Sequence, residues 1–258
     1  MKVKIFLGIF LLAFFSESIA QIRNLPTKFN PLSISATFGY QTPSGDLSTR
    51  FGNNLAAGIG IEYTQIPSGW VFNVESTYIF GTTVKEDVLK LLRTTDGNII
   101  NDLNAYADVS LRERGLYTGA NVGKIFKLHD NGNRFGGIRL TLGGGWLYHK
   151  IRIQDNQDAV PQLSGEYARG YDRFTAGVAL NQFIGYQMVS RDRTINFYVG
   201  FEAIEGFTRN QRGFNFDTGV RDDRKRIDIL YGVKVGWQLA IFTNQKAEEI
   251  EYWGGVMD

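Results

Sequence analysis

The chain contains no cysteine among its 258 residues, and it has two histidines and five prolines. The lack of cysteine excludes a disulfide-linked scaffold and a thiolate-ligated metal. The formal net charge is +2, so the composition gives no reason to expect nucleic-acid binding. Beyond residue 20, no apolar run reaches the roughly 18 residues that a membrane-spanning helix requires. Stability must therefore come from backbone pairing and side-chain packing.

The first twenty residues have the pattern of a secretory signal. Two lysines precede an apolar stretch from Ile5 to Phe15, and small residues precede Gln21. The stretch is too short to cross ~30 Å of hydrocarbon as a helix. We therefore predict a cleaved signal peptide at 1–20, a periplasmic segment at 21–30, a membrane domain at 31–242 and a periplasmic tail at 243–258.

Glycine and aromatic residues are abundant. The chain has 30 glycines and 14% aromatic residues, yet its mean hydropathy is −0.18. This mixture is too polar for a helical membrane protein and too aromatic for an average soluble one. A transmembrane β-barrel explains it, because lipid-facing and lumen-facing residues alternate along each strand.

Alternation of apolar and polar residues with a period of two recurs along the chain. In the clearest case, apolar residues from Leu32 to Tyr40 interleave with Ser, Thr, Gly and Gln. The expected strands lie at residues 32–41, 55–63, 70–80, 116–126, 138–149, 174–187, 195–203 and 227–241. The start of the fourth is the least regular. We predict an all-β fold, an antiparallel up-and-down transmembrane barrel of about eight strands.

The predicted connections alternate in length. Three are short, at 65–69, 127–134 and 190–193, and four are long, at 42–54, 82–108, 152–172 and 207–226. Short turns belong to the periplasmic side of such barrels, so we expect both termini in the periplasm and the long loops outside. Helical spacing of apolar residues also predicts a short helix over Val84–Arg93.

A soluble, lipocalin-like barrel is the alternative fold. Its polar face would have to meet water and its apolar face would form the core. Aromatic residues near strand ends instead resemble interfacial girdles. The opposite face is made largely of Gly, Asn and Glu, which could not form a hydrophobic core.

The last predicted strand carries Lys234, Gly236, Leu239 and Ile241. Their spacing resembles the polar-x-Gly-x-x-apolar-x-apolar signal of outer-membrane barrels, and the resemblance implies insertion by the barrel-assembly machinery. One departure is that residues 243–258 follow the strand, whereas many such proteins end on it.

The mature chain also resembles the small outer-membrane β-barrel proteins of Bacteroidota, which are similar in architecture to OmpA and OmpX. The segments that carry this resemblance are Gly39–Leu47, Val160–Gly165 and Phe214–Asp217. It implies a fold and a location. It implies no activity, because such barrels host many functions.

Six charged residues fall on the predicted lumen face. They are Glu62, Glu75, Arg139, Glu202, Asp228 and Lys234. The interior of an eight-stranded barrel is just wide enough for its side chains, so these charges must pair or retain water. We expect ion pairs that plug the lumen. The alternative is that the same network lines a proton or ion path.

No catalytic, metal-binding or cofactor-binding set is predicted. His129 and His149 fall at opposite ends of the barrel, and we expect each to be a surface residue near the membrane interface. A Ser-His-Asp site around His149 could recruit Asp155, Asp158 or Ser164, but no spacing supports it. The glycines at 143–145 lack a following Gly-Lys-Ser/Thr and are read as curvature glycines.

Two charged segments could contact partners. The run Arg221–Arg226 could grip lipopolysaccharide phosphates or an acidic surface, although a solvated loop base is the simpler interpretation. The tail combines Tyr252 and Trp253 with several glutamates. It could dock into a periplasmic partner or fold back on the membrane interface.

The sequence thus predicts a non-enzymatic outer-membrane barrel that acts as a structural or interaction subunit of an envelope complex. A narrow ion or small-solute channel and a loop-borne adhesin or ligand binder stay open as alternatives, and a His-based hydrolase is the weakest. The expected partners are outer-membrane lipid and lipopolysaccharide, the barrel-assembly machinery and an envelope protein.

Overall fold

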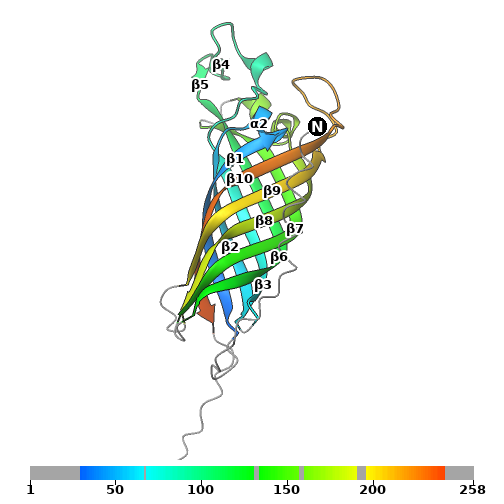
Figure 1. The fold of residues 1–258 in the computed structure, drawn as a ribbon. Coiled ribbons are helices and arrows are strands. Elements are labelled where there is room, and N and C mark those ends of the chain that lie inside the picture. Colours follow the sequence, from blue (N-terminus) through cyan, green and yellow to red (C-terminus); the bar gives the residue numbers. More distant parts are fainter. Residues whose placement is uncertain (1–29, 67, 131–133, 157–159, 191–195, 242–258) are drawn as a thin grey trace, which may run out of the picture.

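The computed structural model describes residues 30–66, 68–130, 134–156, 160–190 and 196–241. Within them, eight strands close into one antiparallel barrel in the order β1-β10-β9-β8-β7-β6-β3-β2 (Figure 1). The strands are β1 (Leu32–Gly45), β2 (Asn54–Gln65), β3 (Trp70–Gly81), β6 (Val109–Asp130), β7 (Arg134–Asp155), β8 (Thr175–Ser190), β9 (Phe197–Asn210) and β10 (Lys225–Ile241). Each pairs with its neighbours in this order, and β1 pairs with β10 to close the ring. The predicted fold class is confirmed.

The outer surface of the barrel is apolar. Phe38, Ile59 and Phe201 each expose about two thirds of their surface, at 69%, 69% and 66%. Polar residues such as Thr37, Asn73 and Gln187 on the same strands are buried inside. A continuous apolar belt of this kind needs hydrocarbon around it, and a polar interior could not serve a soluble barrel as its core. The lipocalin-like alternative fails on this arrangement.

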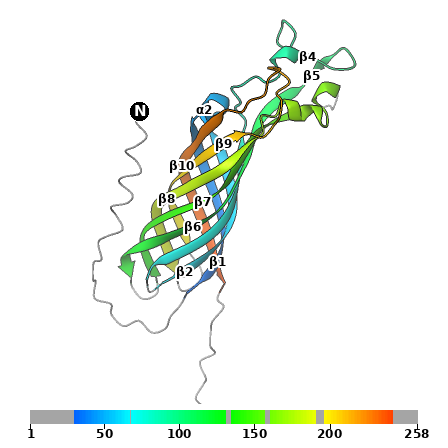
Figure 2. The same cartoon turned by 90° about the vertical axis from the view of Figure 1, so that its right-hand side faces the viewer.

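The two ends of the barrel differ. At the turn end, short connections join β2 to β3, β6 to β7 and β8 to β9, and β1 begins and β10 ends there. At the loop end, residues 46–53, 82–108, 156–174 and 211–224 connect the strands. Figures 1 and 2 show the loops gathered at one end of the barrel. At this end β6 and β7 extend past the ends of their other neighbours, β3 and β8. These two strands have 22 residues each.

The predicted helix over Val84–Arg93 is wrong. That loop contains a single 3-10 turn, η2 (Lys90–Leu92), and a small hairpin of β4 (Ile99–Ile100) and β5 (Tyr106–Ala107). Val88 and Leu89 are adjacent in sequence and both fully buried, whereas Leu91 is 71% exposed. A helix would place its apolar residues on one stripe, so tertiary packing of the loop overrides the local pattern.

Other short helical elements lie at the loop end. They are α2 (Leu47–Arg50), η3 (Pro161–Leu163) and η4 (Tyr167–Gly170). Among the described residues, no helix is both long and apolar enough to cross a membrane.

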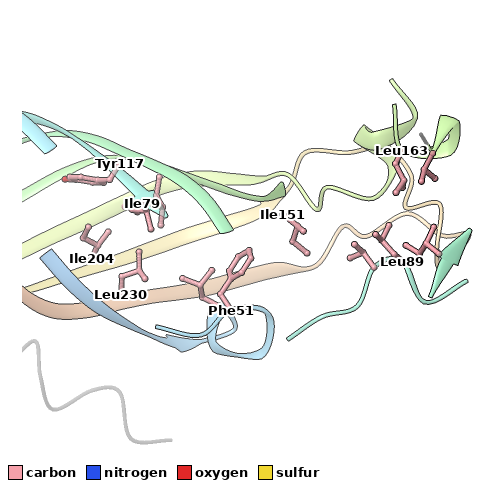
Figure 3. Packing of buried hydrophobic residues seen from close by; sticks show 14 residues of the cluster. Phe51, Ile79, Leu89, Tyr117, Ile151, Leu163, Ile204 and Leu230 are labelled. Atoms are coloured by element: carbon pink, nitrogen blue, oxygen red, sulfur yellow. The ribbon is translucent and has the colours of Figure 1, made fainter. Parts of the chain in front are cut away.

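Buried apolar residues form two clusters. A small one closes the turn end with Ile66, Val71, Ile125, Phe135 and Val189. The larger cluster runs from the lumen into the loops. Figure 3 shows Ile79, Tyr117, Ile204 and Leu230 between the strands, then Phe51 and Ile151, then Leu89 and Leu163 among the loops. The loops therefore share one hydrophobic core with the upper barrel.

Candidate functional site

The predicted lumen charges lie in layers, and the layer nearest the turn end is built around Arg139. Its Nη2 lies 2.8 Å from Oε2 of Glu62. Its Nη1 donates to Oε1 of Gln187 at 3.0 Å, and Gln238 Nε2 donates to Oε1 of Glu62 at 2.6 Å. The guanidinium also lies 4.4 Å from the ring centroid of Tyr198. A buried cation is thus matched by a carboxylate, amides and an aromatic face.

The middle layer is built around Lys234. Its Nζ lies 2.6 Å from Oε2 of Glu75 and 2.7 Å from Oε1 of Glu202. Asn121 donates to Glu75 at 3.0 Å and Asn181 donates to Glu202 at 2.8 Å. Two carboxylates therefore share one ammonium, and the amides supply further donors to the same two carboxylates.

An apolar layer lies above Lys234, toward the loop end. It consists of Ile79, Tyr117, Leu147, Ile204 and Leu230, each at most 1% exposed. The Tyr117 side chain bends over the backbone of Gly119, where an added Cβ would lie 2.3 Å from the tyrosine hydroxyl. These residues interrupt the polar interior with a buried, largely apolar layer.

His149 lies above the apolar layer and is buried, so its predicted place on the surface is wrong. Its Nε2 lies 2.8 Å from Oδ2 of Asp228, and Phe51 packs edge-on against its ring at 5.7 Å. With this contact, each of the six charged residues predicted to face the lumen is paired. The hydroxyl of Thr208 donates to the same Asp228 oxygen. Because this hydroxyl faces the carboxylate, the three groups do not form a nucleophile-base-acid chain.

The other predicted partners of His149 lie elsewhere. Ser164 donates to the Pro161 carbonyl at 2.8 Å, and Asp155 accepts from the Val160 amide at 2.9 Å. Asp158 lies outside the described residues. His129 is exposed in β6 at the turn end, so the two histidines do lie at opposite ends of the barrel.

A cluster of ion pairs ties the four loops together over the mouth of the barrel. Arg50 of α2 lies 2.7 Å from Glu86, and Arg173 also lies 2.7 Å from Glu86. Arg173 makes a two-pronged contact with Asp217, at 2.7 and 2.5 Å. Asp172, next in sequence, binds Arg212 at 2.5 Å. We call the loops and this cluster the loop head.

The loop head also has its own buried apolar residues. Val88, Leu89, Ile99, Val160 and Leu163 are all buried, although they come from two loops far apart in sequence. Loops whose apolar residues continue the barrel core and whose charges form a partly buried ion-pair cluster are packed in place, unlike the mobile loops that usually connect strands.

The electrostatics of the loop head favour a charged Glu86. Burial raises the pKa of its carboxyl group, but the guanidiniums of Arg50 and Arg173 outweigh burial and hold the pKa below its ordinary value of 4.5. Opposite charges at hydrogen-bonding distance favour the ionised carboxylate. Glu86 therefore stabilises the loop head in its charged form.

This charge state predicts how the loop head responds to acid. Because the pKa of Glu86 is lowered in the folded state, the charged carboxylate contributes to stability above pH 4.5. This contribution is lost as the pH falls through the lower folded pKa. Proteolysis of the loops by an acid-active protease should stay slow at pH 5 and accelerate below about pH 4. Glu86→Gln should weaken this acceleration. An unchanged pH profile in that variant would contradict the assignment.

A polar pocket of about 630 Å³ opens at the loop head. It is lined by Arg50, Glu86, Arg173, Arg226 and other residues of 215–224. Arg226 is buried and pairs with Asp222, whereas Arg221 and Arg224 are exposed. The charged run predicted to be a solvated loop base thus forms part of a pocket wall.

The predicted insertion signal lies in β10, with its members on two faces. Lys234 and Gly236 face the lumen, and Leu239 is exposed on the outside. At Gly236 an added Cβ would lie 2.2 Å from Cζ of Tyr198, so only glycine fits beneath that ring. The backbone of Ile241 pairs with Leu32. Tyr252 and Trp253 lie outside the described residues.

Sequence reasoning missed several residues of these sites. Tyr117 faces inward, as the alternation of β6 would have indicated had a bulky aromatic residue been considered for the lumen face. Glu86, Arg173 and Asp217 carry no local signal, because each is an ordinary charged loop residue until the fold brings three loops together.

No protein-family model and no curated protein matches this chain. Solved structures do. Over 81% of this chain and 97% of the other, it is similar to Neisserial surface protein A, at 10% identity and a TM-score of 0.41. It is also similar to Ail, the attachment invasion locus protein of Yersinia pestis, at 9% identity and a TM-score of 0.43, over 83% of this chain and 100% of the other. A third similar structure is the outer membrane protein OprG of Pseudomonas aeruginosa, at 8% identity and a TM-score of 0.38, over 83% of this chain and 97% of the other.

Proposed function

We propose that this chain is a non-enzymatic outer-membrane barrel whose loop end faces outward and whose loop head binds another component of the cell envelope. The observation that carries the proposal is the loop head itself, whose buried apolar residues extend the core of the upper barrel and whose ion pairs join the loops above a lumen filled by side chains. The apolar belt supports the membrane location, and the short connections at the other end support this orientation.

Exposed apolar side chains on the loop head support a role in binding. Leu103 is 80% exposed, and Leu91, Tyr106, Tyr167 and Val220 are also exposed. These residues lie on the loops, away from the belt that lipid covers. Apolar and aromatic residues in such positions are typical of interaction surfaces.

The experiment is cross-linked purification of the barrel from outer membranes, with mass spectrometry of proteins that remain in near-stoichiometric amount. We expect a defined partner with the wild type and its loss with Leu103→Ser plus Tyr106→Ser, since neither exposed side chain holds the fold. The matched control is Phe38→Leu plus Phe201→Leu in the belt. A partner retained by the loop-head variant, or absent in all samples, would refute the proposal.

A second candidate is a loop-borne adhesin or ligand binder, and the pocket at the loop head favours it. The same loop-head variant separates the two functions. If the variant keeps its protein partner but the cells that carry it no longer adhere to surfaces, the result favours the adhesin function.

The channel alternative conflicts with the packed lumen. An ion would have to pass the apolar layer of Ile79, Tyr117 and Leu147 as well as two layers of paired charges. In planar bilayers at neutral pH we expect no discrete openings from the wild-type barrel. Openings whose conductance changes with Glu75→Gln would instead favour a channel.

A further inference from the structure

Four cations form a square on the outer face of the β6–β7 hairpin at the loop end. Arg112 lies directly opposite Arg152, and Arg114 lies directly opposite Lys150. All four share one face, because residues of even number on these two strands point away from the lumen, as Trp146 and Val122 do. We call these residues the cationic square.

Two like-charge pairs, one beside the other, are unfavourable in an antiparallel sheet. Residues directly opposite each other have Cβ atoms about 4.5–5.5 Å apart, and like charges there destabilise the pairing. Within the described part of the chain, none of the four makes an ion pair. Glu113, between Arg112 and Arg114, points to the opposite side and is fully buried. Nε of Arg112 is buried without an acceptor. Arg114 donates to the Glu113 backbone carbonyl at 2.6 Å, but no carboxylate of the described chain forms an ion pair with the square.

The square lies at the edge of the apolar belt. The next outward residues toward the turn end are Leu116 and Tyr148, which are paired with each other. Phe80 of β3 lies opposite Arg114, and Trp146 is 52% exposed just below. Aromatic residues at this position mark the level where hydrocarbon gives way to headgroups.

The dimensions of the belt agree with this placement. Along β7, the outward apolar residues run from Ile138 to Tyr148. At ~3.3 Å per residue and a tilt of ~40°, that stretch covers roughly 25 Å of membrane, the height of the apolar band in such barrels. The next outward residues, Lys150 and Arg152, thus lie in the headgroup layer.

We propose that Arg112, Arg114, Lys150 and Arg152 bind the phosphates of a lipid headgroup in the leaflet at the loop end, namely the paired phosphates of a lipid A-type glycolipid. The proposal rests on the outward orientation of the loop end proposed above. Four cations in a square match two phosphates on one lipid better than a single phosphodiester. The square continues the lipid-covered surface, which favours a lipid over a soluble acidic protein.

The test is equilibrium titration of fluorescently labelled lipid A against the purified barrel in a mild nonionic detergent. Each cation near an anionic lipid surface contributes roughly a fivefold factor in affinity. Replacing all four by glutamine should therefore weaken binding at least about a hundredfold. The matched control removes four exposed charges from the loop head instead, with Lys90→Gln, Arg169→Gln, Arg221→Gln and Arg224→Gln, and should bind as the wild type does.

Each other outcome would overturn the proposal. If both variants lose the same affinity for lipid A, the lipid is attracted by net charge alone. If the wild type binds a lipid with one phosphate as tightly as it binds lipid A, the square is not a site for paired phosphates. If lipid A does not bind, but the quadruple variant of the square loses a cross-linked acidic protein, the square is a protein contact. Insertion into phosphatidylcholine vesicles separates the two proposals. A barrel that inserts but does not bind lipid A would refute the lipid A site and leave the proposed function standing.

Discussion

Replacing Lys234 by methionine is expected to lower the free energy of unfolding of the barrel by about 3–5 kcal/mol. The substitution leaves Glu75 and Glu202 buried in one layer without the ammonium that both contact, at 2.6 and 2.7 Å. An unpaired buried charge costs far more than a lost surface contact, because no water replaces the missing partner. The measurement is reversible unfolding in urea from lipid vesicles, followed by tryptophan fluorescence.

A second variant separates charge from shape in this experiment. Adding Glu75→Gln and Glu202→Gln to Lys234→Met removes the repulsion and should recover much of the lost stability. Lys90→Met, at an exposed loop position, should change stability by less than about 0.5 kcal/mol. A Lys234→Met barrel as stable as the wild type would show that water enters this layer. That result would favour the channel alternative.

Arg173→Met is expected to loosen the loop head while the barrel stays folded. The substitution removes contacts with Glu86 and Asp217, and the Arg173 side chain is 4% exposed. We expect a local loss of about 3 kcal/mol, at the low end for a buried pair because Glu86 keeps a third of its side chain exposed. Amide exchange should accelerate in residues 82–108 and 211–224, and not in β8 or β9.

The matched control for the loop head is Arg169→Met. Arg169 also lies in the third loop and pairs with Glu166, but both side chains are largely exposed, so little change is expected. Unchanged exchange in the Arg173→Met variant would mean that the apolar core of the loops holds the head without the ion pairs. If the loosened head also loses the cross-linked partner, the order of the head is part of its binding function.

The loop head and the cationic square assign different tasks to the two surfaces of the same end. The exposed apolar residues of the head lie on the loops, outside the belt, and would suit a protein partner. The square faces sideways, next to the belt, and suits the membrane. Together they would hold the head at a defined height and rotation above the bilayer.

The strands and the direction in which most of their residues face could be predicted from the sequence alone. Alternation with a period of two is a local property, so Arg139 and Lys234 were placed inside without knowledge of their partners. Strand ends were less accurate: β6 begins at Val109, well before the predicted Leu116, because the hairpin with β7 continues where no other strand accompanies it. The resemblance to Bacteroidota proteins, the signal peptide and the positions of the termini stay predictions.

What the sequence by itself determined is the alternation of each strand, and from it a closed barrel with an apolar outside and a charged inside. Tertiary structure decided which charges meet. Lys234 and Glu75 are 159 residues apart in the chain, and the stagger of the strands sets which residues of distant strands share a layer. Glu86 and Arg173, 87 residues apart, meet because two loops fold onto one core. Such contacts depend on the whole fold, and no local pattern encodes them.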